Sequence, residues 1–299
     1  MELASRTIEV AQGEEVVVLP IGDIQYSGEG SSTALNHLKN DINWGLKHNA
    51  YFIGMGDYTD FASPSNRQRL ASAALYDTAN DVIELSAANI TKELYERALK
   101  PSTNRWLGLL EGHHFFQYGS GITTDMELCD MLKARHLGTS AYVRLEFQDK
   151  VTRKRGPNRG RMGNITLWAH HGAGSGNRAG SPLNRLDQLP IYWDADIYLM
   201  GHQTKRPVSP LQRVEPVWRG NAGPFLKHRT IYIAGTGGYA KAYVAGNRHG
   251  RIPRGDYVEQ KMLNPASLGC IKIRIVANWD AEFGEHGDRH WNPKISIEV

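Results

Sequence analysis

The sequence of 299 residues has little cysteine and no long apolar segment. Only Cys129 and Cys270 occur, which excludes a disulfide framework and a zinc site built on cysteines. The longest apolar run is Val16–Ile21, which contains Pro20 and is far too short for a membrane span. The amino terminus carries acidic residues where a signal peptide needs apolar ones. We therefore expect a cytoplasmic protein with no membrane partner.

The composition is that of a folded chain with a substantial core. Hydrophobic residues make up 40% of the sequence and charged residues 22%, which excludes wholesale disorder. The net charge of +4 permits an anionic partner without requiring one. No repeat or linker-like tract interrupts the sequence, so we expect one domain over residues 1–299. Histidine is unusually frequent, with 12 residues, several of them beside glycine.

Apolar spacing predicts strands alternating with helices over the first two thirds of the chain. We expect helices over about 34–48 and 80–99, the second ended by Pro101. The spacing of Thr124 and Glu127 is that of a capping box. Two packed sheets flanked by helices, in the α/β class, account best for this pattern. The expected strands are 16–22, 51–55, 106–110, 143–147, 164–169, 197–200, 230–234 and 271–275, with 143–147 and 164–169 forming a hairpin.

Polar side chains directly follow five of these strands. Ligands bind beyond the carboxyl ends of strands in α/β sheets, and glycine beside each group allows a sharp turn and close approach to a ligand. Carboxylate and imidazole are the groups that bind Zn, Mn or Fe. Neither a phosphate-binding P-loop nor a Gly-x-Ser-x-Gly nucleophile turn is present. The residues are Asp23 and Gln25, Asp57 and Asp60, His113 and His114, His170 and His171, and His202 and Thr204.

The order of these groups resembles the calcineurin-like metallophosphoesterase superfamily. Its pattern is Asp-x-His, Gly-Asp, Gly-Asn-His-Asp/Glu, His-Gly and Gly-His-x-His, each at a strand end. The resemblance covers most of the chain and implies a four-layer α/β/β/α sandwich of two mixed sheets flanked by helices. It also implies phosphoester hydrolysis by a metal-bound hydroxide. The matching stretches are Asp23-Ile-Gln25, Gly56-Asp57, Gly112-His113-His114, His171-Gly172 and Gly201-His202-Gln203-Thr204.

The resemblance also implies a role for each matching residue. Asp57 would bridge two metal ions, and Asp23 would bind the first of them. His171 and His202 would bind the second ion. His114 would contact the phosphate and protonate the leaving oxygen. His171 is favoured over His170 because glycine follows it.

Several positions depart from the family pattern. Gln25 and Thr204 stand where the family has histidines of the first metal site, and His113 replaces an asparagine. Phe115 replaces the acidic residue after the catalytic histidine. The second site is therefore expected to keep four groups, Asp57, His113, His171 and His202.

The first site retains only oxygen donors. These are Asp23, Asp57 and the amide of Gln25, with Asp60 as a possible substitute ligand. Such a site suits Mg or Mn better than Zn. We expect up to two divalent ions in all, drawn from Mn, Zn, Fe and Mg.

Two basic features could contact substrate. Arg178 lies in the glycine-rich stretch Gly172–Gly180, where it could hold a phosphate or lie in solvent. Lys154 belongs to Lys150–Arg161, which has six basic residues and no acidic one. This stretch is either a solvated hairpin tip or a contact for nucleic acid.

The sequence thus predicts a metal-dependent phosphoesterase, with a phosphodiesterase or nuclease preferred. A phosphomonoesterase or protein phosphatase is the second hypothesis. The third is a non-catalytic metal-binding module, because Gln25 and Thr204 weaken the first metal site.

The nuclease hypothesis predicts that the basic stretch binds polynucleotide. Changing Arg153, Lys154 and Arg155 to Ser should weaken polynucleotide binding and flatten its dependence on salt concentration, because fewer phosphates are neutralised. Hydrolysis of a small chromogenic diester should be unchanged. Equal loss on both substrates would indicate misfolding or a direct catalytic role.

Overall fold

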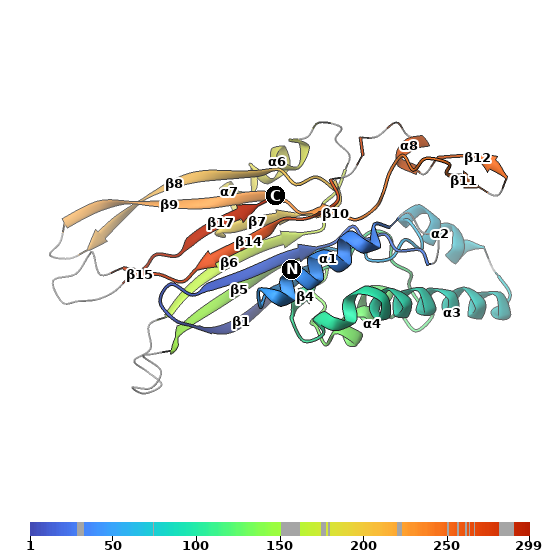
Figure 1. The fold of residues 1–299 in the computed structure, drawn as a ribbon, viewed down its shortest axis with the longest axis horizontal. Helices are drawn as coiled ribbons and strands as arrows, with labels where there is room; N and C mark the ends of the chain where they lie inside the picture. Colours follow the sequence, from blue (N-terminus) through green and yellow to red (C-terminus); the bar gives the residue numbers. More distant parts are fainter. Residues whose placement is uncertain are drawn as a thin grey trace.

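A computed structural model gives the fold (Figure 1). It describes residues 1–28, 33–73, 75–150, 162–174, 178, 180–219, 223–249, 251–255, 257–260, 262, 264–265, 267–280 and 290–299. The described chain is mixed α/β, with two mixed sheets and helices beside them. The α/β class and the two sheets expected from the sequence are confirmed.

The larger sheet has six strands in the order β1-β5-β6-β7-β9-β8. β5 and β6 form the expected antiparallel hairpin, whereas β6, β7 and β9 run parallel to one another. β8 pairs with β9 along its whole length and forms the edge of the sheet. The strands are β1 (Glu2–Val10), β5 (Ser140–Asp149), β6 (Met162–His170), β7 (Ile197–Met200), β8 (Val208–Arg219) and β9 (Gly223–Gly235).

The second sheet has five strands in the order β17-β14-β2-β3-β4. β2, β3 and β4 are parallel, so their carboxyl ends meet at one edge. β14 and β17 continue the sheet in antiparallel fashion. The strands are β2 (Glu15–Ile21), β3 (Tyr51–Gly54), β4 (Trp106–Leu109), β14 (Lys272–Val276) and β17 (Lys294–Glu298).

Helices lie beside both sheets (Figure 1). No helix in the described part of the chain is long and apolar enough to cross a membrane. The helices are α1 (Leu35–Lys47), α2 (Pro64–Ser72), α3 (Asp77–Leu94) with the short turns η1 (Tyr95–Leu99) and η2 (Lys100–Ser102), α4 (Thr124–Leu132), α6 (Ser181–Leu186), α7 (Leu189–Tyr192) and α8 (Tyr257–Gln260). Three two-stranded pairs complete the fold: β10 (Gly237–Gly238) with β13 (Gly269–Cys270), β11 (Arg248–His249) with β12 (Ile252–Pro253), and β15 (Trp279–Asp280) with β16 (His290–Trp291).

Alternate residues of β2 enter two different cores, because successive side chains of a strand point to opposite faces. Val18 packs in a cluster that also holds Leu145 and Leu167 of the six-stranded sheet. Val17 packs on the other side, with Leu38 of α1. From Val16 onward β2 is therefore buried on both faces, which explains why Val16–Ile21 is continuously apolar.

The structure corrects two expectations and adds strands that the sequence pattern did not predict, β1, β8 and β17 among them. The second helix begins at Asp77 instead of Asn80 and changes at Tyr95 into a π-helical turn. α4 is capped by Thr123, because the hydroxyl of Thr124 instead accepts a hydrogen bond from the amide of Phe116. β1 was not predicted at all. Its partner is β5, 130 or more positions away, and pairing at that separation leaves no local pattern in the sequence.

The capping hydroxyl of Thr123 accepts from the amide of Met126 at 3.2 Å. Thr123→Ala should therefore lower the free energy of unfolding by about 1 kcal/mol, because one amide of the first helical turn loses its partner. Thr123→Ser keeps the hydroxyl and should stay close to the parent protein. Urea unfolding curves of the three proteins test this, and an equal loss in the serine variant would contradict it.

Candidate metal centre

The polar groups from both sheets meet at the carboxyl ends of their parallel strands. Asp23 and Asp57 follow β2 and β3, and His113 follows β4. His171 and His202 follow β6 and β7 of the other sheet. The amide of His202 donates to Oδ2 of Asp23 at 2.8 Å, so this hydrogen bond joins the two sheets directly at the site.

Asp57 is buried and held by the loop after β4. Its Oδ1 accepts from the amide of His114 at 3.0 Å and from the amide of His113. Gly112 allows this approach, because a Cβ there would lie 2.2 Å from Oδ1. The glycine therefore has the role expected from the sequence. The two amides fix the carboxylate and leave Oδ2 directed toward the histidines.

The ring of His171 is oriented by its own hydrogen bond. Its Nδ1 lies 2.6 Å from the carbonyl oxygen of Met55, which places the proton on Nδ1 and leaves Nε2 as an acceptor or ligand. Nε2 lies 3.3 Å from Oδ2 of Asp57. A side chain at Gly56 would collide with this ring, since its Cβ would lie 2.6 Å from Nδ1.

Three buried ligand atoms converge without hydrogen-bond partners among the described residues. They are Oδ1 of Asp23, Oδ2 of Asp57 and Nε2 of His171, and such groups lie within 4.8 Å of one another. Unsatisfied buried polar atoms are costly and rare. Two carboxylate oxygens and an imidazole nitrogen form a donor set that suits a divalent ion. These residues therefore fit a bound metal.

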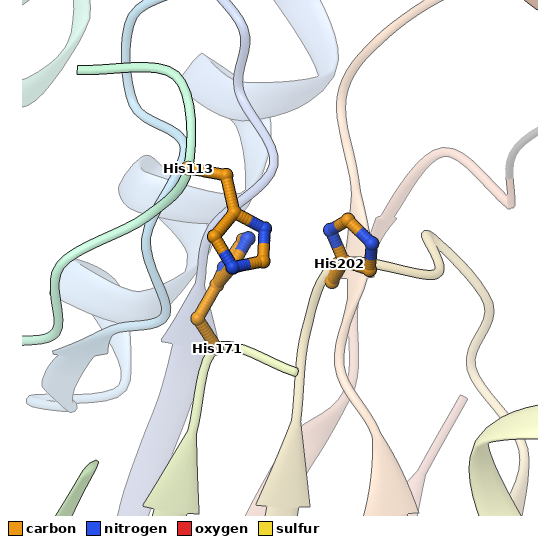
Figure 2. Close-up of side chains that lie close together, drawn as sticks. All are labelled: His113, His171 and His202. Carbon is orange, nitrogen blue, oxygen red and sulfur yellow. The ribbon is translucent and has the colours of Figure 1, made fainter. Parts of the chain in front are cut away.

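A second group consists of three imidazoles (Figure 2). The rings of His113 and His171 are 4.6 Å apart between centroids, and those of His113 and His202 are 4.8 Å apart. Burial lowers the pKa of His202 to about 4 and also lowers that of His113. Both rings are therefore neutral at physiological pH, with a nitrogen lone pair free for a metal.

His171 belongs to both groups and lies next to two carboxylates. Burial opposes a charge on its ring, but the adjacent Asp57 raises the pKa of His171 to about 9. Burial also raises the pKa of Asp23 to about 7. The two carboxylates thus favour a positive charge beside them, which the proton on His171 supplies when no metal is bound. A divalent cation would replace that proton.

His114 lies at the more open side of the site. Its Nδ1 is 2.7 Å from Oδ1 of Asp60, and its Nε2 is 4.0 Å from Oδ2 of Asp57. The hydrogen bond with Asp60 raises the pKa of His114. Asp60, which the sequence offered as a substitute metal ligand, accepts this hydrogen bond and orients His114.

Gln25 and Thr204 flank Asp23. The backbone N–H of Gln25 donates to the backbone carbonyl of Asp57 at 2.9 Å. A Cβ at Gly238 would lie between the side chains of Asp23 and Thr204, at 2.8 and 3.0 Å. Both positions therefore lie on the Asp23 side of the site.

Five residues of the site have a left-handed backbone conformation. This conformation is unusual for residues other than glycine and costs on the order of 1–3 kcal/mol each. It turns the chain at the ends of β2, β3 and β7 and helps bring the side chains together. The residues and their φ angles are Asp23 at 49°, Gln25 at 51°, Asp57 at 54°, His202 at 64° and Thr204 at 48°.

Two residues that support the site were not singled out from the sequence. Asp125, fully buried in α4, accepts from the amide of Gly112 at 3.0 Å, and burial raises its pKa to about 7. Arg67 of α2 donates from Nη1 to the carbonyl of His113 at 2.6 Å. For Asp125, the sequence indicated only an acidic residue in the first turn of α4, and such residues are ordinarily exposed. Nothing in the sequence indicated a role for Arg67.

The remaining predicted residues lie outside these groups. The Nδ1 of His170 accepts from the amide of Gly172 at 2.7 Å, and its ring stacks on Trp168. Arg178 is exposed, and its carbonyl accepts from Nζ of Lys205. Lys154 lies outside the described residues. The strands that lead to it pair Met162 with Gln148, eight positions from His170, which corresponds to about 27 Å.

No family model matches this chain, and no curated protein matches it. The functional assignment therefore depends on the two ligand groups that share His171. Together they offer ligand atoms that could hold a metal ion, with His114 beside them.

The neighbouring histidines at the end of β6, His170 and His171, provide a matched pair for testing metal binding. His171→Ala should abolish tight binding of Mn or Zn, because it removes a ligand from both groups. His170→Ala should leave binding within about twofold, since its ring bonds the amide of Gly172 and none of the ligand side chains, whose bonded partners are the ones that tune affinity. Titration of chelator-treated protein by calorimetry measures both. Loss of binding in the His170 variant alone would show that the ligand had been assigned to the wrong histidine.

Proposed function

We propose that this protein is a metal-dependent phosphoesterase of the calcineurin-like metallophosphoesterase type. The observation that carries the proposal is the convergence of unpartnered buried atoms from Asp23, Asp57 and His171, with His113 and His202 beside them. These are the positions to which the family resemblance gives metal-binding roles. The order of the groups along the chain and the way two sheets contribute to one site both support it.

The four-layer α/β/β/α arrangement is part of this proposal. Three apolar clusters support it. One contains residues of both sheets, including Val18 and Leu167. The second joins the five-stranded sheet to α1 and α3, and the third joins Trp168 and Tyr198 of the six-stranded sheet to α6. Clusters between the sheets and on the outer face of each are what four layers require.

Asp23 would hold one ion, His113, His171 and His202 would hold the second, and Asp57 would contact both. His171 serves only one of them, because Nε2 carries its one free lone pair. Divalent ions in such a pair of sites neutralise the charge of the phosphate and lower the pKa of water. The amides of His113 and His114 keep Asp57 oriented. His171 is kept in the required tautomer by the carbonyl of Met55.

His114 is the proton donor to the leaving oxygen. Its Nδ1 is held by Asp60, so Nε2 is the atom that faces the ligand groups, 4.0 Å from Asp57. This hydrogen bond favours the protonated imidazole and fixes the plane of the ring. The exposed fraction of the His114 side chain, 27%, gives a substrate access to it.

The substrate class is decided by comparing two chromogenic esters. A phosphodiester turned over faster than the matching monoester would support a phosphodiesterase, and cleavage of polynucleotide would support a nuclease. The reverse preference would favour a phosphomonoesterase or protein phosphatase. Metal binding without turnover of any ester, in Mn, Zn, Fe or Mg, would leave a non-catalytic metal-binding module.

The division of roles predicts opposite effects in two variants. His114→Ala should reduce kcat by about 10²–10⁴-fold, the usual contribution of a general acid, with metal content nearly unchanged. Asp57→Asn should lose both metal and activity, because a neutral amide binds cations poorly. Elemental analysis and ester hydrolysis measure the two properties separately. Loss of metal from the His114 variant, but not from His113→Ala, would reverse the two assignments.

A further inference from the structure

A cavity of about 470 Å³ lies between α2, α3 and the loop that follows His114. Arg67 and Leu70 of α2 line one wall, and Ile83 of α3 lines another. Phe116 and Tyr118 of the loop complete it. This volume is within the range of pockets that bind small molecules.

The cavity begins at Phe116, in the loop that carries His113 and His114. Phe116 is two residues from His114, so their Cα atoms are at most about 7 Å apart. Arg67 contacts both regions: its Nη1 donates to the carbonyls of His113 and Phe115 at 2.6 and 3.1 Å, and its side chain lines the cavity. The cavity therefore borders the loop that carries His114.

The walls suit a flat ring that is partly polar. Leu70, Leu75, Ile83 and Phe116 supply apolar surface, and Leu70 and Leu75 are each 36% exposed. In the described part of the chain, the side-chain hydrogen bonds of Arg67 all use Nη1. The other N–H groups of its guanidinium are left to donate to a ligand.

The loop wall is held in place by its own contacts. The ring of Phe116 packs edge-on against Phe61 at 5.0 Å and against Tyr118 at 5.5 Å. Glu84 of α3 accepts from the amide of Gly119 at 2.6 Å. The hydroxyl of Tyr118 donates to Glu127 of α4 at 2.6 Å. The cavity is therefore formed before a ligand arrives, which lowers the entropic cost of binding.

We propose that this cavity binds the aromatic ring of the alcohol that leaves during hydrolysis, either an aryl group or a nucleobase. The proposal rests on the proposed function, because His114 is the group that meets the leaving oxygen. As the oxygen of water bonds to phosphorus, the bond from phosphorus to the leaving oxygen breaks. That oxygen takes the proton of His114, and the attacking water gives up a proton to solvent. The ring beyond the leaving oxygen then occupies the cavity.

The test fills the cavity with a larger side chain. Ile83→Trp introduces an indole from α3, and Leu85→Trp is the matched control, since Leu85 lies on the same helix but is 62% exposed. Two substrates are compared, ethyl naphthyl phosphate and ethyl trifluoroethyl phosphate, whose leaving alcohols differ in having a ring. Ile83→Trp should lower kcat/KM for the naphthyl ester by tenfold or more, on the order of the loss from a blocked apolar pocket. The trifluoroethyl ester and the Leu85 variant should change less than about twofold.

Direct binding separates this proposal from the proposed function. Naphthol and adenosine are titrated into the full chain and followed by saturation-transfer NMR, which requires no turnover. Binding that Ile83→Trp removes and Leu85→Trp keeps supports the cavity, and the ring that binds distinguishes an aryl from a nucleoside substrate. If neither ring binds at millimolar concentration, the proposal is overturned.

Two further results complete the test. A ring that binds to a protein without phosphoesterase activity in any divalent metal would overturn the leaving-group assignment together with the proposed function. If Ile83→Trp fails to fold, as judged by circular dichroism, Leu75→Glu places a charge in the cavity lining from a loop position. It should give the same selective loss on the naphthyl ester.

Discussion

Two carboxylates buried where the two sheets meet are the constraint on which the rest of the site depends. Asp23 and Asp57 are each almost inaccessible to solvent, and an isolated buried carboxylate is very unfavourable. Backbone amides offset part of that cost, from His202 for Asp23 and from the loop after β4 for Asp57. One oxygen of each carboxylate still has no hydrogen-bond partner in the described chain, although Oδ2 of Asp57 lies 3.3 Å from Nε2 of His171. A divalent cation is the group that would satisfy both oxygens.

The backbone around these carboxylates is held in an unfavourable conformation. Five site residues with positive φ would together cost about as much as the net stability of an ordinary domain, which is 5–15 kcal/mol. Hydrogen bonds between the strand ends hold it. The amide of Asp23 donates to Gly56, that of Gln25 to Asp57, and that of Tyr26 to Tyr58, each at 2.9–3.0 Å. Strain concentrated at one point and supported by the surrounding fold is typical of a functional site.

The sequence predicted which residues meet better than it predicted how they are held. Strands and the polar groups after them follow from local patterns, so Asp23, Asp57 and His171 could be placed at one edge. The role of Asp60 could not be predicted, because its distance from Asp57 along the chain fits a ligand as well as a partner of His114. The burial of Asp125 could not be predicted, because an acidic residue in the first turn of a helix is ordinarily exposed. Its burial depends on packing between α4 and β4, to which Gly112 is joined.

His171 belongs to both ligand groups, and it connects the site to the packing of the two sheets. His171 enters from the six-stranded sheet, whereas Asp57 enters from the five-stranded sheet, and both would contact the same ion. An ion that binds only the folded chain stabilises it by about 4 kcal/mol at a thousand times its Kd. Here that stabilisation acts across the boundary between the sheets, where the hydrogen bond from His202 to Asp23 also lies. The metal would thus contribute to the packing of the two sheets as well as to chemistry, and removal of one ligand would weaken both.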